Sequence, residues 1–217
     1  MFYVDMHAHS VASDDSRATV EQYLSWIGAL RRKGFQIDGI VLTEHRQFNK
    51  EVDYSALSKD HGIVILKGAE LDTRSGHFLV YGLTEQLQSS LDYRDVTMDS
   101  SALMAEALRC GAVAVPAHPG RHGIGLAHWM TQGQKFPTVR IVERLNAGNR
   151  PEEQQLADGL ADEHGFLGIG GSDAHFVSSV ARCMTAFPHA IEDESDLVGA
   201  LLDGNVRPVR LEETLKS

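Results

Sequence analysis

The residues of this chain that could do chemistry are histidines and acids that follow short apolar runs. Five runs of strand type each end in such residues: His7 and His9, His45, Glu70, His118, and Asp173 with His175. Random placement would scatter these residue types along the chain. A barrel or parallel sheet with its active site at the carboxyl ends of the strands gathers them at one end. The pattern therefore predicts that these side chains meet in space.

The residue types in this group favour binding of divalent metal ions. Side chains alternate along a strand, so His7 and His9 share a face with their Cα atoms about 7 Å apart, and Asp173 and His175 repeat that spacing. Imidazole combined with carboxylate suits zinc, manganese or ferrous iron better than calcium, which prefers oxygen ligands alone. The candidate ligands are His7, His9, Asp14, His45, Glu70, His77, His118, Asp173 and His175.

This set of nine residues is too large for one ion. A catalytic zinc takes about three protein ligands, so a cluster of two or three divalent ions (Mn²⁺, Zn²⁺ or Fe²⁺) is the economical interpretation. Such clusters generate hydroxide near neutral pH and hold the attacking and leaving oxygens of a phosphoryl displacement.

Two of the candidates have a structural alternative. Asp14 stands beside Ser13 and Ser16, where it could start a turn or cap a helix. His77 opens a strand, a position where histidine is often a satisfied structural group. Glu70 follows a run that looks buried, where an unpaired carboxylate would be costly, so a ligand role is favoured for it.

The elements that must position these residues alternate between strand and helix. Helices are predicted at 19–33, where an amphipathic stripe follows a capping box at Thr19 and Gln22, and at 151–164, where proline opens the segment and glycine follows it. Further helices are expected near 52–60, 100–109 and 195–202, and strands near 40–42, 63–66, 77–81, 112–116, 139–145 and 166–169. The alternation is typical of α/β architecture with a parallel core. The glycine-rich segment 120–133 is interpreted as a functional loop or lid.

Composition narrows the class of protein. With 217 residues, 42% of them apolar and 23% charged, the chain is expected to form one globular domain spanning residues 1–217. The formal net charge of −10 argues against binding of duplex nucleic acid. No segment is long and apolar enough to cross a membrane, and the two cysteines show no pairing motif, so a cytoplasmic location is expected. The oligomeric state stays open.

The ordered motifs resemble those of the polymerase and histidinol phosphatase (PHP) superfamily. In chain order they are Asp5-Met6-His7-Ala8-His9, Ser13-Asp14, Thr43-Glu44-His45, Gly68-Ala69-Glu70, His77, Ala117-His118-Pro119 and Ser172-Asp173-Ala174-His175. Glu44 departs from the family pattern, which has Asp at that position, and Asp15 stands where Gly often follows the Ser-Asp pair.

The resemblance implies a single-domain, distorted (β/α)7 TIM-like barrel that holds up to three metal ions. It assigns one ion to His7, His9, Glu70 and Asp173. It assigns a second ion to Glu70, as a bridging ligand, with His77 and His118, and a third to Asp14, His45 and His175.

Phosphate recognition requires cations beyond the metals, and the planar guanidinium group matches phosphate oxygens. Arg46 follows His45, and Arg121 closely follows His118, so both arginines are expected at the mouth of the barrel as phosphate-binding candidates. The alternative for either arginine is a surface salt bridge.

Together these features predict a metal-dependent phosphoesterase that hydrolyses a small phosphate ester through a metal-bridging hydroxide. A nucleotide, a sugar phosphate or a histidinol phosphate would fit, and short single-stranded oligonucleotides are kept as a second substrate class. Two other hypotheses are an amidohydrolase-like metal hydrolase of C–N or C–O bonds and a non-catalytic PHP module. Three features disfavour the first, because amidohydrolase barrels usually supply a lone Asp late in the chain: the separate Glu70, the Ala117-His118-Pro119 motif and the late pair of Asp173 and His175. The complete ligand set disfavours the second.

Overall fold

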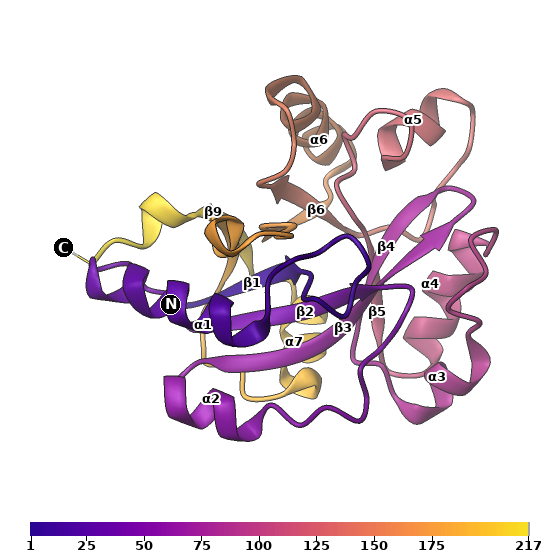
Figure 1. Ribbon diagram of the computed structural model, residues 1–217. Helices are drawn as coiled ribbons and strands as arrows, with labels where there is room; N and C mark the ends of the chain where they lie inside the picture. Colours follow the sequence, from indigo (N-terminus) through magenta and orange to yellow (C-terminus); the bar gives the residue numbers. More distant parts are fainter. Residues whose placement is uncertain (217) are drawn as a thin grey trace.

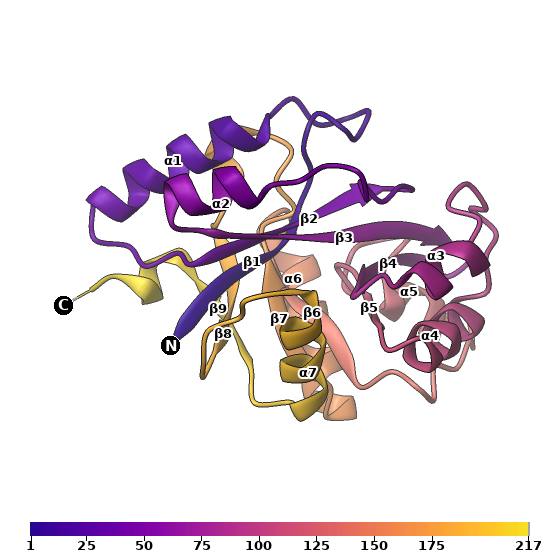
Figure 2. The same cartoon turned by 90° about the horizontal axis from the view of Figure 1, so that it is seen from below.

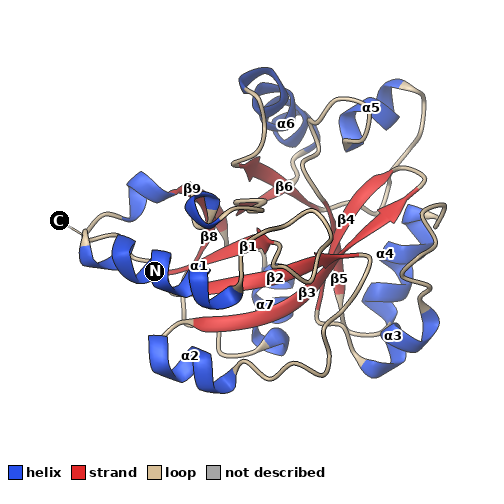
Figure 3. Ribbon diagram, viewed as in Figure 1, coloured by secondary structure: helices blue, strands red, loops and turns tan. Residues whose placement is uncertain are grey.

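The computed structural model describes residues 1–216, and this part of the chain forms one α/β domain built on two sheets (Figures 1 and 3). The larger sheet has seven strands in the order β5-β4-β3-β2-β1-β8-β9. Their bounds are β1 Phe2–Ala8, β2 Gly39–His45, β3 Val64–Thr73, β4 Gly76–Tyr81, β5 Val113–Pro116, β8 Cys183–Phe187 and β9 Arg207–Arg210. The smaller sheet pairs β6 (Ile141–Asn146) with β7 (Leu167–Gly171).

The two sheets together form a curled, barrel-like wall. Strands β1, β2 and β3 run parallel, as do β6 and β7, whereas β4, β5, β8 and β9 each pair antiparallel with a neighbour. The small sheet packs against both ends of the large one, β7 against β9 and β6 against β5. The expected single-domain α/β fold of TIM-like type is thus confirmed, as a mixed α/β fold built on a curled sheet. The parallel core is limited to β1–β3 and β6–β7.

Seven α-helices cover this wall within residues 1–216. They are α1 Val20–Arg32, α2 Ser55–His61, α3 Glu85–Ser90, α4 Ser100–Arg109, α5 Leu126–Thr131, α6 Pro151–His164 and α7 Glu194–Asp203, with short 3₁₀ turns at η1 Val177–Ser179 and η2 Leu211–Thr214. Figure 2 shows α1 and α2 on one face of β1–β3 and the small sheet on the opposite face. No helix in this described range has the length and apolar character needed to cross a bilayer.

Local sequence signals account for the helix ends. The Thr19 side chain accepts a hydrogen bond from the backbone N–H of Gln22, which is the predicted capping box. Pro151 opens α6, and Gly165 ends it in the left-handed region at φ 66°. The segment expected to be a loop at 120–133 contains the short helix α5, and α3, β8 and β9 lie outside the elements predicted from the sequence.

The strands that carry the candidate site are buried on both faces. In β2 six consecutive residues from Gly39 to Glu44 are buried, and Val41 packs in a cluster with Val4, Leu66 and Ile169 from β1, β3 and β7. This burial on both sides explains why these runs are continuously apolar rather than alternating. The packing of β7 against β1 fixes the carboxyl ends of both strands close together.

A glycine permits this close approach of β7 to β1. A Cβ atom at Gly171 would clash with the His7 side chain and lie 2.6 Å from Glu143 Oε1. We expect Gly171→Ala to lower the free energy of unfolding by about 1–3 kcal/mol, the usual cost of forcing extra volume into a packed interior. The matched control is Gly159→Ala in α6, where nothing lies within 4 Å of the added Cβ. Urea denaturation of both variants provides the measurement, and equal stabilities would contradict the packing argument.

Candidate metal centre

Four side chains converge on one point: His7 in β1, His9 directly after β1, Glu70 in β3 and Asp173 in the loop after β7. His7 Nε2 lies 2.9 Å from His9 Nε2 and 3.2 Å from Glu70 Oε2. Asp173 Oδ1 lies 3.5 Å from each of the two imidazole nitrogens, and Glu70 Oε2 lies 3.3 Å from His9 Nε2. Four ligands about 2.1 Å from an ion, at the corners of a tetrahedron, lie about 3.4 Å apart. The donor atoms are therefore spaced as a small divalent cation requires.

The other oxygen of Glu70 faces a second donor group. Glu70 Oε1 lies 3.0 Å from His77 Nδ1 and 3.1 Å from His118 Nε2. These three residues form a second set whose ligand atoms lie within 4.8 Å of one another. One buried carboxylate thus belongs to two adjoining donor groups.

A third group consists of His9, His45 and His175. The ring centroid of His9 is 4.2 Å from that of His45 and 4.4 Å from that of His175. Asp15 Oδ2 lies 3.4 Å from His45 Nε2 and 3.2 Å from His175 Nε2.

The structure does not bring Asp14 to this third group, where the family pattern expected it. The Asp14 side chain is 79% exposed and lies 3.6 Å from the Arg46 guanidinium. Consecutive backbone turns at Ser10–Ser13 and Ser13–Ser16 direct neighbouring side chains to different sides, and here Asp15 is the one turned toward the imidazoles. The remaining eight predicted ligands lie in the three groups.

Burial and mutual charge shift the titration of the cluster. Burial alone would lower the pKa of His7, but Glu143, Asp173 and Glu70 hold it well above its usual range. Burial would raise the pKa of Glu70, but the imidazoles of His7 and His118 hold it well below. Burial lowers the pKa of His45 to about 4.

Two buried imidazole nitrogens have no hydrogen-bond partner within residues 1–216. They are His9 Nδ1 and His118 Nδ1. An orphaned buried polar atom costs free energy unless something outside the protein satisfies it. Both rings turn Nε2, not Nδ1, toward Glu70, so the spacing of the donor atoms, rather than these two nitrogens, is the observation that fits a cation site.

Strained backbone accompanies the cluster. Arg46, His118 and Asp173 are non-glycine residues with φ of 51°, 30° and 52°. Such conformations cost about 1–3 kcal/mol each and persist where the surroundings hold them. Backbone hydrogen bonds supply that restraint: Arg46 N–H donates to the carbonyl of Glu70 at 2.8 Å, and Asp173 N–H donates to that of His7 at 2.7 Å.

Sequence reasoning missed Glu143, Asn146 and Asp15. Glu143 and Asn146 lie in β6, where they are 0% and 2% exposed. The available signal was an acid inside the apolar strand predicted at 139–145, because a buried carboxylate needs partners. Asp5, in β1 beside His7, is fully buried and belongs to none of the three donor groups. It accepts hydrogen bonds from the backbone N–H groups of Ser172 and Ala181 at 2.8 Å, and burial raises its pKa to about 6 despite them.

The two arginine candidates lie beside the cluster and are engaged by acids. The Arg121 guanidinium donates to Asp173 Oδ2 at 2.8 Å and to Asn146 Oδ1 at 3.2 Å. Arg46 is 41% exposed and lies 3.3 Å from Asp72 Oδ2. Arg121 therefore contacts the donor groups through Asp173, whereas Arg46 belongs to the outer rim.

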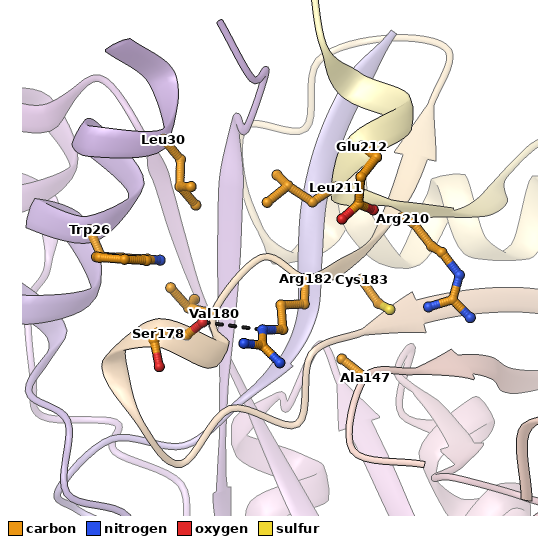
Figure 4. Close-up of a pocket in the computed structure, with 10 residues that line it drawn as sticks. All are labelled: Trp26, Leu30, Ala147, Ser178, Val180, Arg182, Cys183, Arg210, Leu211 and Glu212. Atoms are coloured by element: carbon orange, nitrogen blue, oxygen red, sulfur yellow. Dashed lines mark hydrogen bonds between the residues drawn. The ribbon is translucent and has the colours of Figure 1, made fainter. Parts of the chain in front are cut away.

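A separate cavity of about 400 Å³ lies between α1, η1 and the end of β9 (Figure 4). Trp26, Arg182, Arg210 and Glu212 are among the residues that line it. None of the predicted ligands, and neither Arg46 nor Arg121, lines this cavity, so it is distinct from the metal centre.

Comparison with known proteins agrees with this architecture. Residues 151–206 match the model of the PHP-associated family. The chain is 25% identical to the uncharacterized protein MJ0417 of Methanocaldococcus jannaschii, a match that covers 99% of this chain and 82% of that protein.

Two solved structures share the fold. PsfC of Pseudomonas syringae PB-5123 superposes with a TM-score of 0.70 at 21% identity, covering 98% of this chain and 93% of that one. Endonuclease Q, in complex with a 27-mer duplex substrate carrying an abasic lesion, superposes with a TM-score of 0.68 at 14% identity, covering 95% of this chain and 58% of that one. The match of residues 151–206 to the PHP-associated family agrees with the resemblance to the PHP superfamily, and the solved structures show that the fold is shared.

Proposed function

We propose that the protein is a metal-dependent phosphoesterase that binds up to three divalent ions at this centre. The observation that carries the proposal is the position of Glu70, whose two carboxylate oxygens face two different groups of imidazole nitrogens at 3.0–3.3 Å. A carboxylate shared in this way suits two cations held close together, as in the two-metal sites that catalyse phosphoryl displacement.

The proposed ligand sets follow the three donor groups, with His9 assigned to the first ion and Asp15 added to the third. His7, His9, Glu70 and Asp173 would hold one ion, and Glu70, His77 and His118 a second. His45 and His175 would hold the third with Asp15 in place of Asp14, because Asp15 is the acid within 3.2–3.4 Å of both imidazoles. Imidazole and carboxylate donors serve Mn²⁺, Zn²⁺ and Fe²⁺ alike.

When bound, the ions would polarise a phosphoryl oxygen and supply a nucleophile at neutral pH. The chain's own contribution is positioning and charge. Arg121, fixed by Asp173 and Asn146, presents a guanidinium beside the cluster, where it would bind a phosphate oxygen and orient the ester. Arg46 would attract the anionic substrate from the rim, because it is exposed and less tightly held.

A small phosphate ester is the substrate class we favour. The rim carries acids as well as arginines, since Asp14, Asp15 and Asp72 surround Arg46 and His45. A surface of mixed charge suits one phosphate group better than the continuous backbone of duplex DNA. Endonuclease Q, which is similar to this chain only in fold, binds a 27-mer duplex substrate with an abasic lesion, so phosphodiesters and short oligonucleotides belong in the test. A cytoplasmic location stays a prediction.

The test is hydrolysis of a substrate panel after chelation and metal add-back. Phosphate monoesters, diesters, a short oligonucleotide, an amide and a lactone are compared for wild type, His9→Ala and Asp173→Ala. We expect metal-dependent phosphate ester hydrolysis, lowered in both variants by more than about 100-fold, the upper range for residues that merely support a ligand. Hydrolysis of the amide or lactone alone would favour the amidohydrolase hypothesis, and failure to bind metal would favour the non-catalytic module.

A further inference from the structure

Two buried carboxylates support the cluster without belonging to any of its donor groups. Glu143 from β6 is 0% exposed, and Glu44 from β2 is 1% exposed. Within residues 1–216 neither lies within 4.0 Å of a lysine or arginine nitrogen. An ionised group in such a position is costly unless hydrogen-bond donors surround it. Their partners therefore show what each carboxylate does.

Glu143 holds three donors that lead to the first and second donor groups. Its Oε1 lies 2.9 Å from His7 Nδ1. Its Oε2 accepts from the backbone N–H of His118 at 2.7 Å and from Asn146 Nδ2 at 2.9 Å. Asn146 Nδ2 also lies 3.3 Å from Asp173 Oδ2. One carboxylate thereby fixes an imidazole ring, the strained backbone of His118 and the amide that contacts Asp173.

The contact with His7 also fixes its tautomer. If Nδ1 carries the hydrogen and donates it to Glu143, Nε2 is left with its lone pair facing the other donors of the first group. A hydrogen bond of this kind from the distal nitrogen is a common way to orient and strengthen a histidine ligand.

Glu44 holds the loop that leads to the third donor group. Its carboxylate accepts from the Ser10 backbone N–H at 3.1 Å, from Ser10 Oγ at 2.5 Å and from Ser13 Oγ at 2.6 Å. Ser13 Oγ in turn accepts from the backbone N–H of His45 at 3.0 Å. Glu44 thus fixes the backbone of residues 10–13. The turn that follows these residues places the Asp15 carboxylate beside His45.

We propose that Glu143 and Glu44 are separate positioning residues, Glu143 for the first and second donor groups and Glu44 for the third, so that the metal sites weaken independently. The inference rests on the proposed metal binding. It adds that the cluster has two separately supported parts.

Replacement of Glu143 by glutamine keeps the volume but removes one acceptor. All partners of Glu143 are donors, whereas a glutamine amide offers one oxygen and two N–H donors. The NH₂ group must then face His118 N–H or the Nδ1 atom of His7. In the second case the His7 tautomer reverses and Nε2 is protonated, which blocks ligation. At Glu44 the serine hydroxyls can rotate to accept from the amide, so Glu44→Gln is the milder change.

The experiment measures metal affinity and location in wild type, Glu143→Gln, Glu44→Gln and Glu152→Gln, an exposed control on α6. Equilibrium dialysis with Mn²⁺ gives the number and affinity of bound ions, and anomalous scattering from crystals soaked in Mn²⁺ identifies the positions. We expect Glu143→Gln to weaken the first two positions by about 10–100-fold and leave the third unchanged. Glu44→Gln should weaken only the third, and Glu152→Gln none.

Each outcome supports or overturns the proposal that Glu143 and Glu44 support different metal positions. Equal affinity of Glu143→Gln and wild type, or uniform loss at all three positions in a folded variant, overturns the inference. Should circular dichroism show Glu143→Gln unfolded, Asn146→Ala replaces it, and we expect loss at the first position with the second retained; loss at neither overturns the inference. A wild-type protein that binds no ion contradicts the proposed function itself, which is a different failure.

Discussion

Replacement of Glu70 by glutamine is expected to remove bound metal and phosphoesterase activity together, lowering turnover by more than about 100-fold. The Oε2 atom faces His7, His9 and the Nδ1 atom of His45, the last at 3.1 Å. The Oε1 atom faces the second donor group. A glutamine amide carries no charge and directs N–H donors at imidazoles whose lone pairs would ligate the ions. Both neighbouring sites therefore lose a ligand through one substitution.

The measurement pairs metal content by elemental analysis with phosphate release under saturating metal. Glu163→Gln, an exposed position on α6, is the matched control and should behave as wild type. Thermal unfolding in excess chelator tests whether the metal-free variant is folded. Wild-type metal content in a folded Glu70→Gln protein would refute the central role assigned to this carboxylate.

The second large effect is a rise of metal affinity with pH. The pKa of His7 is held well above its usual value by neighbouring carboxylates despite burial, and that of His77 is raised by Glu70 and Asp72. The raised pKa favours the doubly protonated form of each imidazole in the metal-free protein, so a cation must compete with a proton for the ring nitrogen. Each displaced proton makes affinity rise about tenfold per pH unit below the folded pKa.

Isothermal titration in buffers of different ionisation enthalpy counts these protons directly. Proton release and tighter binding at higher pH are the expected results, and an affinity independent of pH across the neutral range would contradict the pKa directions. The metal-free fold should respond in the opposite sense. Its stabilisation by the His7 ion pairs is complete below the ordinary histidine pKa and is lost as the pH rises through the raised value.

Most of the residues of the metal centre could be predicted from the sequence, because their positions depend on the periodicity of side chains along a strand. Alternation along β1 places His7 and His9 on one face, and the rule that sites form at strand ends brings in residues as distant as Glu70 and Asp173. The helix ends at Thr19 and Gly165 follow from capping preferences that act within one turn.

The tertiary structure decided the choices that involve distant partners. Adjacent acids at 14 and 15 look equivalent along the chain, yet turns through Ser10 and Ser13, held by Glu44, send Asp15 to the imidazoles and Asp14 to Arg46. Strand direction in β4, β5, β8 and β9 depends on pairing between segments far apart in the chain, which short apolar runs do not encode.

The sequence by itself determined which side chains are available for metal chemistry and that they gather where strands end. Only the folded chain decided which carboxylates face the donor groups and which support them from behind. Glu143 illustrates the reason: its partners His7 and His118 lie 136 and 25 residues away in sequence, so its role exists only once β6 packs against β5 and β7 packs against β1. Residue type and spacing are properties of one segment, whereas a hydrogen bond to a buried carboxylate is a property of two.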